Sequence, residues 1–276
     1  MSAIAPGIKL PPLETTGRVR FDRVLLSEWT KLRSVRSTKW SLAVGFLLTI
    51  AFPVAFSFVT SSHWGSMSPH ERADRHPLDI ALAGVNVAQL AIAVLGVLLI
   101  SAEYSTGSIR STLTAVPKRL PVLWAKLLDY AVVSIVLMVP AVLVSFFASQ
   151  AILARHDILQ ISFTQSGVAR SVLGGAVYVM LVGIFALAIG AIVRNTAGGI
   201  AAFAAIFFVL PPLMFVLPTS WNNAISQYLP SNAGRQLFAL QHAAHTLTPL
   251  HGGLVFLAYC AAAIVIAAVL LVRRDV

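Results

Sequence analysis

Six long apolar runs constrain most strongly what this chain can fold into. They cover approximately residues 40–60, 79–100, 123–149, 171–193, 197–217 and 252–272. An α-helix of about 20 residues, rising ~1.5 Å per residue, crosses a hydrocarbon core ~30 Å thick. A membrane β-barrel would instead show segments of about ten residues with alternating polarity. The runs therefore predict an all-α membrane protein with six transmembrane helices.

Composition agrees with this fold class, because 58% of the residues are hydrophobic and only 11% are charged. Soluble domains contain roughly 45 to 50% apolar residues. The third run is over-long and carries Lys126 and Asp129 near its start. We expect its first turns to lie in the membrane interface, where these side chains reach water. The first 39 residues contain no uninterrupted apolar core, so we expect no cleaved signal peptide.

The distribution of Lys and Arg predicts the orientation in the membrane. Of the 20 Lys and Arg residues, 14 fall before the first run, between the second and third, between the fourth and fifth, or after the sixth, and Lys126 at the start of the third run brings this side to 15. Cytoplasmic connections carry the excess of positive charge. We therefore predict a cell membrane protein with both termini and residues 101–121 in the cytoplasm. The net charge of +10 then faces anionic lipid headgroups, which leaves no reason to expect nucleic acid as a partner.

The residues before the first span divide into a tail and a helix. Residues 1–17 contain three prolines and no aromatic residue, which predicts a disordered tail. Residues 18–38 show the pattern of a basic amphipathic helix lying on the inner leaflet. Residues 39–276 then form one transmembrane domain. The membrane-surface anchor that we predict consists of Phe21, Leu25, Trp29, Lys31 and Arg33.

The predicted outer segment, residues 218–251, is too long for a simple connection. Ser231 or Asn232 is a suitable cap for a helix running to about Thr246. His242 and His245 would share a face of this helix and lie near His251. Two imidazoles without a fixed third ligand seldom form a specific site, so we expect these histidines to be polar loop residues and not a metal site.

The chain shows no known catalytic motif. It lacks G-x-x-x-x-G-K-[ST], H-E-x-x-H, C-x-x-C and G-x-S-x-G, and its single cysteine, Cys260, lies within the last run. We therefore expect no enzyme activity and no cofactor in this chain.

Two amides occur within the second run. Asn86 and Gln89 are three residues apart and share one face of the predicted helix. An unpaired amide in hydrocarbon costs a few kcal/mol, so we expect these side chains to bond to another helix or to line a watery path. Both roles remain open at this stage.

Three sequence segments resemble a known family. They are LLSEWTKLRSVRST before the first span, EYSTGSIRSTLTAVPKRLPVLWAKLL between the second and third, and IGAIVRNTAGG between the fourth and fifth. A weaker fourth segment is LPSNAGRQL in the outer region. With the six-span layout, the chain resembles the membrane subunits of type-2 ATP-binding-cassette (ABC) exporters, in the branch common in high-GC Gram-positive bacteria (Actinobacteria).

This resemblance implies a half-transporter that pairs with a second copy or a paralogous permease and is driven by separate cytoplasmic ABC ATPases, which hold ATP and Mg²⁺. In such permeases the loop after the second span docks on the ATPase. The resemblance places Glu103, Tyr104, Gly107 and Arg110 on this coupling segment, with Lys126 closing it. It also places the substrate path at the interface between permeases, where Asn86 and Gln89 are candidates. The cargo would be a small amphipathic molecule, drug, antibiotic, peptide or lipid.

Two other functions remain open from the sequence. One is a secondary transporter without an ATPase, although no series of carboxylates within the spans suggests a proton relay. The other is a membrane sensor or scaffold that does not transport and uses the outer histidine-rich loops.

Overall fold

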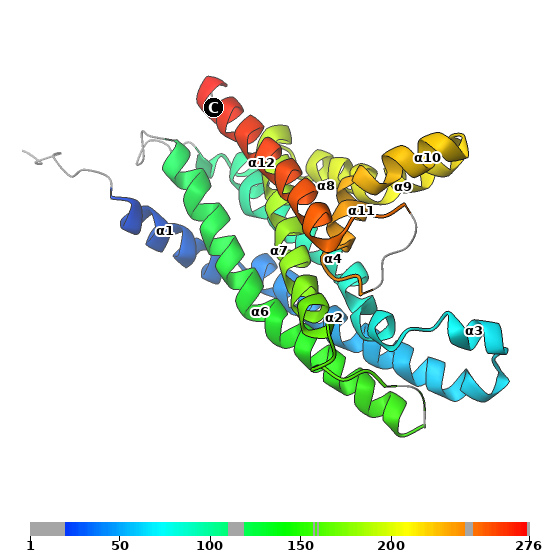
Figure 1. Ribbon diagram of the computed structural model, residues 1–276. Coiled ribbons are helices and arrows are strands. Elements are labelled where there is room, and N and C mark those ends of the chain that lie inside the picture. Colours follow the sequence, from blue (N-terminus) through cyan, green and yellow to red (C-terminus); the bar gives the residue numbers. More distant parts are fainter. Residues whose placement is uncertain (1–19, 110–118, 157, 159, 241–244, 275–276) are drawn as a thin grey trace, which may run out of the picture.

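The computed structural model describes residues 20–109, 119–156, 158, 160–240 and 245–274. Every regular element in this part of the chain is helical (Figure 1). Six helical segments are long and apolar enough to cross a membrane, so the predicted all-α, multi-pass membrane protein is confirmed. These segments are Arg36–Ser66 (α2 and a 3₁₀ turn), Pro77–Ser105 (α4), Leu120–Ala154 (α6), Val168–Val193 (α7), Thr196–Val216 and Pro249–Arg273 (α12).

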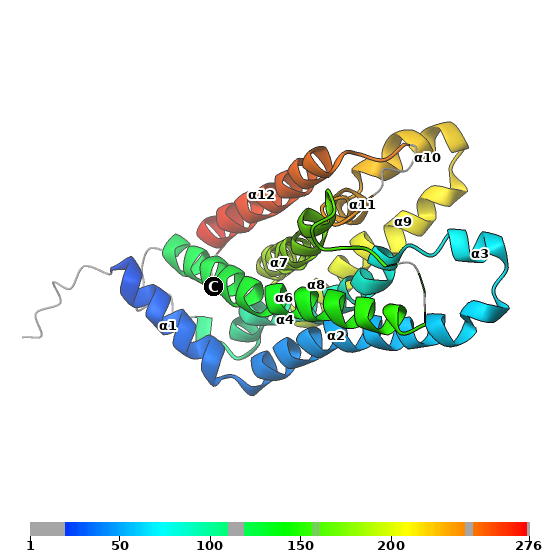
Figure 2. The ribbon, with the colours of Figure 1, turned by 60° about the horizontal axis from the view of Figure 1, so that its bottom comes forward.

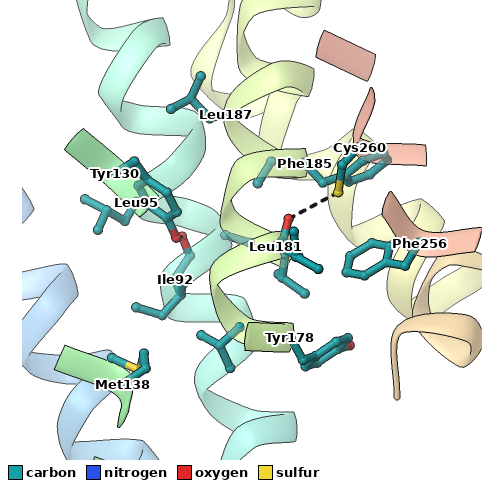
Figure 3. Close-up of a cluster of buried hydrophobic side chains, with 14 of the residues drawn as sticks. Ile92, Leu95, Tyr130, Met138, Tyr178, Leu181, Phe185, Leu187, Phe256 and Cys260 are labelled. Atoms are coloured by element: carbon teal, nitrogen blue, oxygen red, sulfur yellow. Dashed lines mark hydrogen bonds between the residues drawn. The ribbon is translucent and has the colours of Figure 1, made fainter. Parts of the chain in front are cut away.

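Helix α7 occupies the centre of the bundle. Figures 1 and 2 show it between α4 and α6 on one side and α12 on the other. Figure 3 shows how side chains of α7 fill the space toward α12. Leu181 and Phe185 lie near Phe256 and Cys260 of α12, and the Cys260 thiol donates to the Leu181 carbonyl. The buried core is therefore built around α7.

Glycine allows α4, α6 and α7 to approach closely. Gly96 of α4 lies directly against the Gly183 backbone of α7, and a Cβ on Gly183 would overlap the Tyr130 hydroxyl of α6. The Tyr130 side chain is 1% exposed, and its hydroxyl donates to the Ile92 carbonyl at 3.4 Å (Figure 3). Small residues let transmembrane helices pack at short separation, and here they also admit a tyrosine between them.

The turn from α7 to the fifth span uses only two residues. Arg194 adopts a left-handed backbone conformation with φ of 57° and ends α7. Asn195 then caps α8 (Thr196–Ala204) by accepting a hydrogen bond from the Gly198 N–H at 2.8 Å. An αL residue followed by an asparagine cap reverses the chain within a very short turn.

The fifth span is not a uniform α-helix. After α8 come a π-helical turn at Ala205–Val209, α9 at Leu210–Leu213 and a 3₁₀ turn at Met214–Val216. Pro211 and Pro212 have no N–H to donate to the carbonyls one turn earlier, so the regular hydrogen-bond ladder cannot continue there. The irregular turns lie on either side of these two prolines.

The N-terminal helix, α1, covers Phe21–Ser34, which is shorter than the predicted 18–38. Val35 is extended and α2 begins at Arg36, so residues 36–38 belong to the first span. The extended residue turns α1 away from the axis of α2. Helix α1 then lies against the start of α6, where Val24 packs with Val122 and Ala125.

One face of the start of α6 is buried, which makes the prediction that Lys126 and Asp129 reach water wrong. Lys126 and Asp129 are each 6% exposed and do not reach water as an interfacial turn would allow. Helix α1 and the end of α4 cover this part of α6.

The predicted outer segment forms several short helices. They are α10 (Thr219–Ile225), a 3₁₀ turn (Ser226–Tyr228) and α11 (Pro230–Arg235). The predicted helix from Ser231 or Asn232 to Thr246 is wrong, because α11 begins at Pro230 and ends at Arg235. Proline is suited to the first helical position, and Asn232 instead donates to the Ser226 carbonyl at 2.8 Å. Another connection at this end contains α3 (Pro69–Ala73), whose N-terminus is closed by a Ser68–Glu71 capping box.

We expect Gly183→Ala to destabilise the protein by about 1–3 kcal/mol, since the added methyl meets Tyr130 and overpacks the core. Helix propensity alone would favour alanine by about 1 kcal/mol. Gly65→Ala is the matched control, because nothing lies within 4 Å of a Cβ at that position. The midpoint of thermal unfolding in detergent, followed by tryptophan fluorescence, measures the difference. A midpoint for Gly183→Ala equal to that of the control would contradict the close packing of α6 on α7.

Candidate functional site at the α1 end of the bundle

Most of the residues that the sequence predicted for coupling gather at the end of the bundle where α1, the last turn of α4 and the first turns of α6 meet. We call this the α1 end. Glu103 and Tyr104 lie in the last turn of α4, and Lys126 lies in the second turn of α6. The orientation that places the α1 end in the cytoplasm stays a prediction from the Lys and Arg distribution.

Four side chains form an ion-pair cluster, which we call the Glu28–Lys126 cluster: Glu28, Lys31, Glu103 and Lys126. The Lys126 ammonium donates to Glu28 Oε2 at 2.6 Å and to Glu103 Oε1 at 2.8 Å. The Lys31 ammonium donates to Glu28 Oε1 at 2.7 Å and to Glu103 Oε1 at 3.0 Å. Each lysine thus bridges the same two glutamates. The cluster joins α1, α4 and α6.

The centre of the cluster is withdrawn from solvent. The side chains of Glu28 and Lys126 are 4% and 6% exposed, and that of Glu103 is 12% exposed. A buried charge is tolerated when it is paired and its hydrogen-bonding capacity is used. The third hydrogen of Lys126 meets this requirement by donating to the Leu99 carbonyl at 3.2 Å.

Lys31 at the edge of the cluster remains a cation well above neutral pH. Burial by itself would lower the pKa of its ammonium, but the hydrogen bond to Glu28 and the charge of Glu103 outweigh that effect. The pKa of Lys31 is therefore raised above its ordinary value. This side chain points into the protein, although the sequence assigned it to the membrane-surface anchor.

Glu28 was not predicted from the sequence. Its neighbours one turn away on either side, Val24 and Leu32, are also buried, so Glu28 occupies the centre of the α1 face that packs on α6. An acid with an apolar residue four positions away on each side is the signal that could have identified it. Of the predicted membrane-surface anchor, Phe21 is exposed, and Leu25 and Trp29 are half-buried. Contact of this surface with the membrane stays a prediction.

Tyr104 connects α4 to the other side of the bundle. The Arg194 guanidinium lies 5.1 Å from the centre of the Tyr104 ring, a cation–π contact. Arg194 also donates to the Leu270 carbonyl at 3.0 Å, and Arg119 donates to the Leu271 and Arg274 carbonyls at 3.0 Å. Positive side chains at the last carbonyls of α12 are favoured by the helix dipole. Ser101 and Thr196 add a hydroxyl contact of 2.8 Å between α4 and α8.

The remaining coupling residues lie at the end of α4 and beyond it. Gly107 follows the last turn with φ of 71°, a conformation that costs a residue with a Cβ roughly 1–2 kcal/mol. It therefore ends α4 and turns the chain into the predicted docking segment. Arg110 lies outside the described residues.

The two amides of α4 differ in their surroundings. Gln89 is 2% exposed, accepts a hydrogen bond from the Tyr178 hydroxyl of α7 at 2.5 Å and donates to the Asn86 carbonyl. It thus bonds to a neighbouring helix, one of the two roles left open by the sequence. The Asn86 side-chain oxygen has no hydrogen-bond partner among the described residues.

His245 and His251 do not share a helix. His245 lies in a turn with φ of 60°, and His251 lies in the first turn of α12 with its ring 2.7 Å from the Thr248 hydroxyl. His242 and the predicted tail, residues 1–17, lie outside the described residues.

Comparison with models of known protein families finds no match, and comparison with curated proteins finds none either. The site must therefore be interpreted from its own geometry and chemistry.

We expect Lys126→Met to destabilise the protein by about 3–5 kcal/mol, because it leaves Glu28 and Glu103 buried next to each other with only Lys31 between them. The thermal midpoint in detergent measures the loss. Lys39→Met is the control, since Lys39 is exposed.

A second variant separates charge from packing. Adding Glu28→Gln and Glu103→Gln to Lys126→Met removes the uncompensated carboxylates, and we expect it to recover part of the lost stability. If the triple variant is no more stable than Lys126→Met, the loss comes from packing and not from the ion pairs.

Proposed function

We propose that this chain is the permease subunit of an ABC exporter, driven by a separate ATPase that docks on residues 101–121. The segment motifs and the six-span layout motivate the proposal. The single observation that supports it best is that the last turn of α4 bonds in two directions. Glu103 pairs with lysines of α1 and α6, and Tyr104 contacts Arg194, which in turn holds α12.

A coupling element needs this kind of connection. An ATPase pushes on a loop, and the loop can bias two states of a bundle only if it is rigidly joined to the helices that move. Glu103 and Tyr104 immediately precede the Gly107 turn into the docking segment. A displacement of that segment would therefore act on α1, α6, α7 and α12 together. We further propose that two permeases assemble side by side, as a homodimer or with a paralogue.

The nucleotide chemistry belongs to the partner in this proposal. The chain has no P-loop, so ATP and Mg²⁺ would be held by the ATPase subunits and this chain would not be an enzyme. The cargo would be a small amphipathic molecule, drug, antibiotic, peptide or lipid. Gln89 is a weaker candidate for the substrate path than its position in the sequence indicated, because its amide already bonds to Tyr178.

Purification from the native membrane tests the proposal. We expect a soluble subunit with a P-loop to co-purify at one-to-one stoichiometry and vesicles containing both subunits to transport only when ATP is supplied. Transport by this chain alone, driven by an ion gradient, would establish a secondary transporter instead. Absence of both an ATPase and transport would favour a sensor or scaffold.

We expect Glu103→Gln to uncouple the complex, so that ATP hydrolysis continues while the transport rate falls about tenfold. A tenfold factor corresponds to a change of ~1.4 kcal/mol in the free-energy difference between two states. Neutralising Glu103 weakens its pairing with Lys31 and Lys126. Glu71→Gln is the control, since Glu71 caps α3 at the opposite end and glutamine preserves the cap. Coupled transport at the control rate in Glu103→Gln would remove Glu103 from the coupling element.

A further inference from the structure

A cavity of about 450 Å³ lies beside the Glu28–Lys126 cluster, between α1, the start of α2, the end of α4 and the start of α6. Much of its wall is apolar and comes from Leu32, Val35, Leu98, Leu99 and Ala102. Small-molecule sites are typically hollows of roughly 300–1,000 Å³ with apolar walls and a few placed polar groups. This cavity has the size and the lining of such a site.

The polar groups in its wall carry an excess of negative charge. Three carboxylates line the cavity, those of Glu28, Glu103 and Asp129, together with two ammonium groups, those of Lys31 and Lys126. All three ammonium hydrogens of Lys126 already donate hydrogen bonds, and both carboxylate oxygens of Glu28 already accept one. Among the described residues that line the cavity, acceptors and one net negative charge are therefore left unmatched.

Two of these acceptors are buried without a partner. Glu103 Oε2 and Asp129 Oδ2 accept no hydrogen bond from any described residue. The Asp129 side chain is 94% buried, being 6% exposed, and makes no ion pair with the lysines of the cluster. A buried carboxylate without a partner costs several kcal/mol, so the site gains free energy if a cation enters or if Asp129 takes up a proton.

The shape of the cavity indicates which kind of cation fits. A bare metal ion prefers several oxygen ligands converging at 2.0–2.6 Å, whereas this cavity is wide, largely apolar and already holds two ammonium groups. An ion with an apolar body matches both parts of the wall. Its charge would lie near Asp129 and Glu103, and its body would contact the leucines and Ala102.

We propose that this cavity binds an amphipathic organic monocation, with Asp129 as its counter-charge. The proposal does not rest on a transport function, because binding to the isolated chain requires neither an ATPase nor a second permease.

Tetraphenylphosphonium and tetraphenylborate provide a direct test, since they share shape and size and differ in the sign of their charge. Binding of each radiolabelled ion to the full chain is measured by equilibrium dialysis in detergent. We expect saturable binding of tetraphenylphosphonium at one site per chain and no saturable binding of tetraphenylborate.

Asp129→Asn keeps the shape of the side chain and removes its charge. We expect it to weaken tetraphenylphosphonium binding about tenfold or more, as loss of a charge-assisted contact does. Asp79→Asn is the matched control: it removes one carboxylate from the first turn of α4, at the opposite end of the bundle, and should bind like the unaltered chain. A second variant, Ala102→Leu, fills the cavity with apolar volume and should abolish binding without changing any charge.

Three outcomes would overturn the proposal. Equal binding of the two ions would show an apolar site without charge selectivity. Unchanged affinity in both Asp129→Asn and Ala102→Leu would place the ion elsewhere. Absence of saturable binding, with Asp129→Asn as stable as the unaltered chain, would show that Asp129 is a neutral, protonated side chain and that the cavity holds no cation.

Discussion

The buried ammonium of Lys126 is the interaction on which the α1 end of the structure depends. One side chain on α6 holds a glutamate from α1 and another from α4, and its remaining hydrogen bonds to a backbone carbonyl. In a low-dielectric surrounding such bonds are strong, and removing the Lys126 charge would leave the two buried glutamates to share Lys31 alone. These ion pairs explain how α1, a short helix outside the spans, is fixed against the bundle although its apolar contact with Val122 and Ala125 is small. The same ion pairs make the end of α4 part of a rigid unit, so that this helix terminus does not fray.

Much of the fold could be predicted because hydrophobicity in a membrane protein is a local property of the chain. Each span needs about 20 apolar residues whatever its neighbours are, so the six runs were recognisable one by one. Element ends were less predictable. The α1 boundary depends on the extended Val35, and α11 ends at Arg235 although no proline follows until Pro249. Such ends are set by tertiary packing, which leaves little trace in a single sequence.

The site could be predicted only in part, for a related reason. Glu103 and Lys126 stood out because charges are rare near the spans, and the structure brings them together. Glu28 was not distinguishable from an ordinary surface acid, because its burial comes from α6, nearly 100 residues later in the chain. The same contact explains the error about Lys126 and Asp129: both were assigned to the interface, whereas α1 covers them. Pairing between distant helices decides which charges are buried, and helix periodicity alone does not contain that information.

The π-helical turn in the fifth span has a consequence for how that span presents its side chains. The Leu210 N–H donates to the Ala205 carbonyl, five residues earlier, so the turn contains one residue more than an α-helical turn. Successive residues of an α-helix are about 100° apart around the axis, so the extra residue shifts the angular phase of everything that follows by about that amount. A helical wheel drawn through Thr196–Val216 as one helix therefore assigns Leu213 and Phe215 to the wrong sector. Periodicity in any residue-by-residue scan of this span should be fitted as two separate phases that meet at Ala205–Val209.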